Sequence, residues 1–137
     1  MNSIQKTPHR LEIMLVDDDE QEISTITRAL NSSNKPIHLQ VMRTGEAALN
    51  YLHPHEGQKP HLLPELILIE VDHTGCHGFE VLEDVKTHLD FSSIPVVLLT
   101  EQDHGVLPSY FGGTCHIVCK PLDQERLLDV LESDSPN

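Results

Sequence analysis

Five short apolar segments recur along the chain, and amphipathic segments separate them. Two of the apolar segments, Leu66–Val71 and Val96–Leu99, are almost continuous, which is typical of strands that are covered on both faces in a parallel sheet. The pattern therefore predicts five strands. They are Leu11–Val16, Ile37–Met42, Leu66–Val71, Val96–Leu99 and His116–Cys119.

Apolar residues recur at helical spacing in the segments between these strands. Ile23, Ile26 and Leu30 share one face of the first, and Thr44 is the expected N-cap of the second. The predicted helices are Glu20–Asn31, Gly45–Leu52, Gly78–Leu89 and Asp123–Leu131. The apolar face of the third is expected to consist of Phe79, Leu82, Val85 and Leu89. Glu101–Gly113, which contains three glycines and a proline, is the poorest helix of the chain.

A strand and then a helix, repeated five times, indicates a doubly wound α/β fold, in which helices cover both faces of a parallel sheet. We expect the strand order 2-1-3-4-5. With 137 residues the chain is long enough for one domain with a buried core. We place this domain at residues 10–132 and expect disordered ends at 1–9 and 133–137.

Charge and composition exclude several classes of partner. Nine Lys and Arg against 22 Asp and Glu give a formal net charge of −13, so nucleic acids and anionic membrane surfaces should be repelled. No apolar run approaches the roughly 20 residues that a membrane-spanning helix needs. Met1–Arg10 lacks the apolar segment that a secretory signal contains. The chain has three cysteines, and this odd number does not suggest a set of disulfide bonds. These features predict a cytoplasmic protein.

Polar residues follow the predicted strands. Carboxylates follow the first and third strands, a hydroxyl ends the fourth and an ammonium group follows the fifth. These residues are Asp17, Asp18, Asp19, Glu70, Asp72, Thr100 and Lys120. The carboxyl ends of parallel strands meet at one edge of a sheet, where ligands bind. Clustered carboxylates suit a hard divalent cation such as Mg²⁺, and a lysine and a hydroxyl beside it suit a phosphoryl group.

Four motifs, each at a strand end, together resemble the receiver domain of two-component response regulators. The motifs are Ile13–Asp19, Pro64–Glu70, Ile94–Thr100 and Cys119–Pro121, and Gly78 also matches. The resemblance extends from Leu11 to about Leu131 and is greatest to single-domain regulators that partner phytochrome-type histidine kinases. It implies a flavodoxin-like fold, a histidine kinase or another signalling protein as partner, and output through protein contact. Whether the chain forms a homodimer stays open.

The resemblance also implies a metal site. Asp17 and Asp18 match the acidic pair that holds Mg²⁺ in the family, and Glu70 and the backbone of Asp72 complete the set. Because these carboxylates repel one another, at least one pKa should be raised unless a cation binds. We expect weak Mg²⁺ binding that depends on Asp18.

Two further residues match the family's phosphoryl switch. Thr100 corresponds to the hydroxyl that follows the phosphoryl group, and Lys120 to the lysine that binds carboxylate and phosphoryl oxygens. The peptide between Lys120 and Pro121 is typically cis in this family. The family usually has an aromatic residue three positions before the lysine, where this chain has Ile117.

The phosphoacceptor position departs from the family, because Glu70 stands where an Asp is expected. The added methylene moves the carboxylate by about 1.3–1.5 Å, and a displacement near 1 Å can cost on the order of a hundredfold in rate. The longer side chain is expected to reach toward Lys120 and Thr100 and to imitate part of the phosphorylated state. We therefore interpret the chain as a pseudo-receiver, not an enzyme beyond residual autophosphotransfer.

Two alternatives remain open at this stage. The first is a working receiver that a histidine kinase phosphorylates on Glu70 or Asp72. The second is a small flavodoxin-like enzyme or nucleotide binder, which the absence of a glycine-rich loop after the first strand disfavours. The loop histidines, among them His53, have no zinc-site spacing and are expected to be solvated.

Overall fold

The strands and helices follow the predicted alternation closely. The computed structural model describes residues 10–54, 62–72, 77–101, 115–119 and 125. Its elements in chain order are β1 (Leu11–Val16), α1 (Glu20–Asn31), β2 (Ile37–Met42), α2 (Gly45–Leu52), β3 (Leu66–Glu70), α3 (Gly78–Thr87), β4 (Val96–Thr100) and β5 (Cys115–Cys119). The predicted termini, most of Glu101–Gly113 and, apart from Glu125, the predicted helix Asp123–Leu131 lie outside the described residues.

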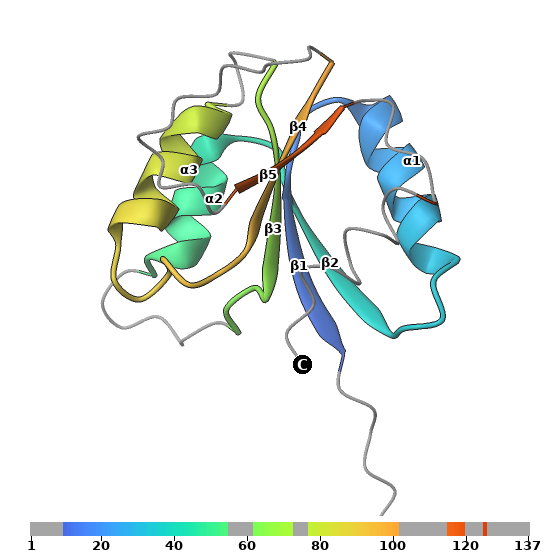
Figure 1. Ribbon diagram of the computed structural model, residues 1–137, viewed down its shortest axis with the longest axis horizontal. Coiled ribbons are helices and arrows are strands. Elements are labelled where there is room, and N and C mark those ends of the chain that lie inside the picture. Colours follow the sequence, from blue (N-terminus) through green and yellow to red (C-terminus); the bar gives the residue numbers. More distant parts are fainter. Residues whose placement is uncertain (1–9, 55–61, 73–76, 102–114, 120–124, 126–137) are drawn as a thin grey trace, which may run out of the picture.

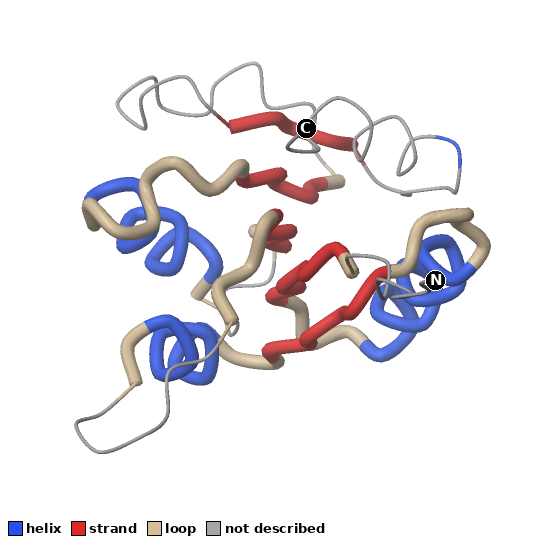
Figure 2. The backbone as a smooth tube through the Cα atoms, turned by 90° about the horizontal axis from the view of Figure 1, so that it is seen from below, coloured by secondary structure: helices blue, strands red, loops and turns tan. Residues whose placement is uncertain are grey.

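The five strands form one parallel sheet in the order β2-β1-β3-β4-β5. The predicted order and the doubly wound α/β fold are thus confirmed. Figures 1 and 2 show α1 on one face of the sheet, with α2 and α3 on the other. Among the described residues, no helix is both long and apolar enough to cross a membrane.

Alternating side chains of the central strands fill two separate cores. Ile13 and Leu15 of β1 pack with the apolar face of α1, whereas Met14 and Val16 pack with α2 and α3. This division follows from the two-residue period of a strand, which sends neighbouring side chains to opposite faces. All six residues of β1 are buried, as expected for a strand inside a parallel sheet.

The apolar face of α3 differs from the predicted one. The helix buries Val81, Leu82 and Val85, whereas Phe79 is 41% exposed and Leu89 is 93% exposed. The helix ends at Thr87, so Leu89 lies beyond its last turn. Leu82 and Val85 were predicted correctly, and Phe79 and Leu89 were not.

The start of α3 is fixed by a close contact with β3. A Cβ atom on Gly78 would lie 2.4 Å from the carbonyl oxygen of Glu70 and 2.8 Å from Cγ2 of Ile69. Only a residue without a side chain allows this approach. His77, the residue before it, has φ of 54°, in the left-handed region. The packing at Gly78 therefore sets the distance between the end of β3 and the start of α3.

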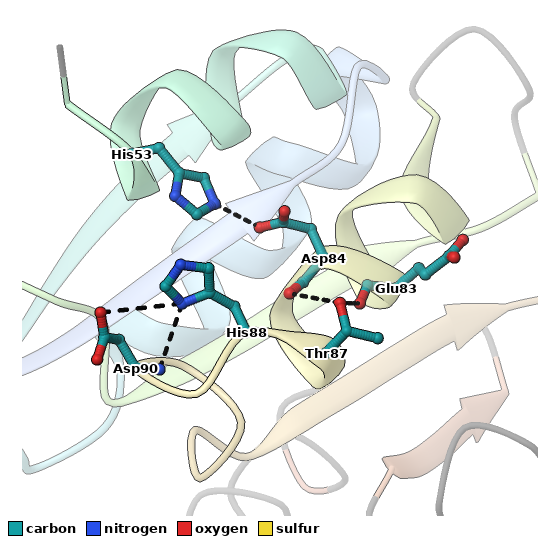
Figure 3. A network of polar contacts seen from close by, with 6 residues as sticks. All are labelled: His53, Glu83, Asp84, Thr87, His88 and Asp90. Atoms are coloured by element: carbon teal, nitrogen blue, oxygen red, sulfur yellow. Dashed lines mark hydrogen bonds and ion pairs between the residues drawn. The ribbon is translucent and has the colours of Figure 1, made fainter.

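The other ends of α2 and α3 meet in a cluster of polar and aromatic side chains (Figure 3). His53, after the last residue of α2, places Nε2 2.7 Å from Oδ2 of Asp84 in α3. Its ring meets those of His88 and Phe91 edge to face, with centroids 4.8 and 5.0 Å away. His53 thus links two helices, and its side chain is only partly solvated, being 37% exposed.

Candidate functional site

The carboxyl ends of β1, β3 and β4 lie at one edge of the sheet, at the top of Figure 1. The strand register determines which side chains meet there. Val16 pairs with Ile69, so the residues that follow them, Asp17 and Glu70, are neighbours. Glu70 in turn pairs with Leu99, which brings the chain after β3 beside the end of β4.

Three carboxylates form the centre of this edge. Oxygens of Asp17, Asp18 and Glu70 all lie within 4.8 Å of one another. Asp17 and Glu70 are fully buried, whereas Asp18 is exposed, so the group has a wall inside the protein and an opening toward solvent. Carboxylate oxygens converging in this way are the ligands that Mg²⁺ and Mn²⁺ prefer. The structure therefore brings together three of the predicted metal ligands.

The carboxyl group of Asp17 is the most perturbed of the three. Burial is the main cause that raises its pKa to about 8, and the carboxyl groups of Glu22 and Glu70 raise it further. One opposing contact lowers the pKa, because the backbone N–H of Asp19 donates to Oδ1 at 2.9 Å. Oδ2 is buried, and no N–H group among the described residues donates to it. A divalent cation would compensate this buried charge, so the donor set fits the metal that the sequence predicts.

Asp19, which follows Asp17 and Asp18 in the chain, is not part of the carboxylate group but stabilises the start of α1. Its side chain caps α1 by accepting hydrogen bonds from the backbone N–H groups of Gln21 and Glu22. Capping fixes the first turn of α1 beside the acidic group, and this turn supplies Glu22. Glu22 is not among the residues predicted from the sequence, although an acid three residues after an N-cap is a known helix-start pattern.

Glu70 folds back on its own chain. Its Oε1 accepts a hydrogen bond from the backbone N–H of Asp72 at 2.7 Å. The side chain is fully buried, and its backbone carbonyl lies under Gly78. The contact with Asp72 orients the first residues after β3 and directs that chain toward β4.

Thr100 is also fully buried, and its hydroxyl group contacts Asp72. The hydroxyl donates to Oδ1 of Asp72 at 2.6 Å, and the backbone N–H of Glu101 donates to Oδ2, also at 2.6 Å. A hydroxyl group has one proton to donate, so its acceptor is Asp72 and not Glu70. The expectation that Glu70 reaches toward Lys120 and Thr100 stays a prediction, and the acceptor of the Thr100 hydroxyl in the structure is Asp72.

Three other residues of the predicted site are not described with their side chains. Lys120 and Pro121 lie outside the described residues, and of Ile117 only the backbone, as part of β5, is described. The sequence predicts Thr100 as a switch residue and Asp72 as a backbone metal ligand or an alternative acceptor, but it does not predict the hydrogen bond between their side chains. Glu101 was not selected, because a backbone N–H leaves no signal in a sequence.

Comparison with known proteins identifies the class to which this fold and site belong. The family described as "Response regulator receiver domain" matches residues 13–132, so the chain belongs to this family. Receiver domains are signalling modules of two-component systems, which interact with histidine kinases and other signalling proteins and bind Mg²⁺ or Mn²⁺ at an acidic pocket. This membership argues against the flavodoxin-like enzyme considered above.

Two curated proteins are similar in sequence to most of this chain. The chain is 32% identical over 122 residues to "Probable methanogenesis regulatory protein FilR2" of Methanothrix harundinacea (strain 6Ac), covering 88% of this chain and 78% of the relative. It is 29% identical over 122 residues to "Response regulator Rcp1" of Synechocystis sp. (strain ATCC 27184 / PCC 6803 / Kazusa), covering 88% of this chain and 81% of the relative.

Solved structures show the same similarity. The bacteriophytochrome response regulator RtBRR has a TM-score of 0.82 and 28% identity, over 94% of this chain and 80% of the other. The Mn²⁺-bound form of Rcp1 has a TM-score of 0.72 and 27% identity, over 90% of each chain. The chain is therefore close to phytochrome-associated regulators.

Proposed function

We propose that this chain is an atypical receiver that has Glu70 at the phosphoacceptor position and transmits its signal through protein contact. Its state would be set by the fixed carboxylates of the site and not by phosphorylation. The observation that carries this proposal is the position of Glu70, which is fully buried at the carboxyl end of β3 and grouped with Asp17 and Asp18. A receiver places its phosphoacceptor at this point of the sheet.

The contacts of Glu70 also argue that it accepts phosphate poorly. An acceptor carboxylate needs a free oxygen in line with the phosphoryl group, and displacement by about one C–C bond lowers the rate steeply. Oε1 of Glu70 is turned back onto the backbone N–H of Asp72 at 2.7 Å, so that an attack on a phosphoryl group would have to come from Oε2. The metal-side residues are in place, but the nucleophile is longer and held in a folded shape.

A divalent cation fits the same proposal. Asp17, Asp18 and Glu70 would hold Mg²⁺, with the backbone of Asp72 as a fourth ligand, and the cation would supply positive charge beside the buried carboxylates. Binding should be weak and should depend on Asp18, the exposed member. Titration calorimetry with Mg²⁺ tests this, and tight binding that is unchanged in Asp18→Ala would contradict it.

The main experiment is intact-mass analysis after incubation with acetyl phosphate or phosphoramidate and Mg²⁺. The mass of the parent protein should not increase stably by that of one phosphoryl group. Glu70→Asp should regain some modification, because Asp17, Asp18 and Thr100 are still present. Glu70→Gln serves as the matched control of nearly equal size without a nucleophilic carboxylate.

Two results would contradict the proposal that the chain is not phosphorylated, and a third would show a further change in the site. A stable phosphoryl gain on the parent protein that is lost in Glu70→Gln would make the chain a working receiver that uses Glu70. A gain that persists in Glu70→Gln and maps to Asp72 would make Asp72 the acceptor. Absence of any gain in Glu70→Asp would show that the segment after β3 has lost its catalytic geometry as well.

A further inference from the structure

The carboxylate of Asp72 makes two short contacts with the end of β4. Oδ1 accepts the hydroxyl proton of Thr100, and Oδ2 accepts the backbone N–H of Glu101, each at 2.6 Å. The distance from the hydroxyl group lies within the usual range for a hydrogen bond to a charged oxygen, and the distance from the N–H group is slightly shorter than that range. Asp72 therefore binds two donors of the next strand at once.

Two adjacent donors that converge on one anion form a small oxyanion receptor. The hydroxyl of Thr100 is fully buried, so this donor must have an acceptor inside the protein. A phosphoryl or phosphate oxygen is, like a carboxylate oxygen, a negatively charged acceptor of hydrogen bonds. An external oxyanion and the Asp72 carboxylate would thus compete for the same two donors.

We infer that Asp72 is an internal anion that occupies the oxyanion receptor of Thr100 and Glu101. An incoming oxyanion must displace it. The position of Asp72 is prepared by Glu70, whose Oε1 holds the backbone N–H of Asp72 at 2.7 Å. A tethered group acts at a high effective concentration, so Asp72 outcompetes a free anion of equal intrinsic affinity. This inference rests on the proposed function only in that both concern the same sheet edge.

Nuclear magnetic resonance tests the inference without any phosphoryl transfer. Inorganic phosphate is titrated into the metal-free protein, and the backbone amide signal of Glu101 is followed. The parent should not respond, because its receptor is filled. Asp72→Ala should show a saturable shift of the Glu101 signal. The matched control is Asp90→Ala, which removes the same charge from a residue that lies after α3 and is highly exposed.

A second readout needs no ligand. Loss of Asp72 should speed hydrogen exchange of the Glu101 amide by on the order of tenfold or more, the effect of losing a hydrogen bond to a charged group. The side chain of Thr100 should also change from one rotamer to several. If Asp72→Ala does not fold, Asp72→Asn keeps one acceptor oxygen without the charge and should show smaller changes in the same direction.

Three outcomes would overturn the inference. They are an equal phosphate response in the parent and in Asp72→Ala, no phosphate response in either protein, and unchanged exchange at Glu101 in Asp72→Ala. None of them depends on whether Glu70 accepts a phosphoryl group, because inorganic phosphate carries no transferable group. The failure of this inference is therefore distinguishable from the failure of the proposed function.

Discussion

The substitution Asp17→Asn should stabilise the metal-free protein at neutral and alkaline pH. Asn has nearly the same shape, and its oxygen still accepts the N–H of Asp19, which lies 2.9 Å from Oδ1 of Asp17. Its amide group can donate to the carboxyl groups of Glu22 or Glu70, which raise the pKa of Asp17 in the parent. The variant thus removes a buried charge and leaves the packing intact.

The pKa of Asp17 gives both the sign and the size of this effect. The folded-state pKa is raised from 3.8 to about 8, so folding must keep a proton that the unfolded chain releases. The contribution of Asp17 to stability is therefore fully present below pH 3.8 and is lost as the pH rises to about 8. At about 1.36 kcal/mol per pH unit, the loss has an upper limit of roughly 5–6 kcal/mol. Because the exposed Asp18 opens the group to water, we expect a gain on the order of 2 kcal/mol in the variant.

Urea unfolding with a chelator, at several pH values from 3.8 to above 8, measures this gain, because these two values bound the range in which the folded and unfolded chains differ in the protonation of Asp17. The difference in unfolding free energy between Asp17→Asn and the parent should grow with pH and level off above about 8. Asp18→Asn removes an equal charge from an exposed position and should give little gain. Saturating Mg²⁺ should stabilise the parent and not Asp17→Asn. A difference that is independent of pH, or a parent that is the more stable protein at high pH, would refute the reasoning.

Three further predictions concern the same edge of the sheet. Gly78→Ala should lower the unfolding free energy in urea by about 1–3 kcal/mol, because its Cβ would meet the carbonyl of Glu70 at 2.4 Å; wild-type stability would contradict the close approach. Asp19→Ala should cost about 1 kcal/mol in the same assay through loss of the α1 cap, and exposed Asp90→Ala should cost almost nothing. The affinity for Mg²⁺ should rise with pH up to about 8, because Asp17 must release its proton, and calorimetry in buffers of different ionisation enthalpy should detect that proton; affinity independent of pH would show that Asp17 is not a ligand.

The sequence predicts most of the fold because each signal is local. The apolar runs that form β1, β2 and β3 have both the length and the continuity of buried strands, and the observed bounds agree within a residue. The N-cap at Thr44 is confirmed, since its hydroxyl accepts the N–H of Ala47 at 3.0 Å. Phe79 is exposed although its spacing fits, because the contact of Gly78 with β3 decides how α3 is turned.

The sequence predicts which residues form the site, but only some of the contacts between them. Asp17, Asp18 and Glu70 could be grouped because the ends of parallel strands must meet. The link from Asp72 to Thr100 could not, because it depends on the register between β3 and β4 and on the direction of the chain after Glu70. Neither of these quantities is encoded in a local pattern.

The contact between Gly78 and the carbonyl of Glu70 has a consequence for how sequences of this kind can vary. It closes the chain between these two residues into a loop whose ends touch. The entropy of closing a flexible loop changes only slowly as the loop becomes longer, so residues can be inserted between the two ends at a small thermodynamic cost. Variation that alters the chemistry beside the acidic group, including the residue that occupies the position of Asp72, can therefore accumulate without moving β3 or α3. The residues beside the acidic group can thus change while the strand and the helix that flank them stay in place.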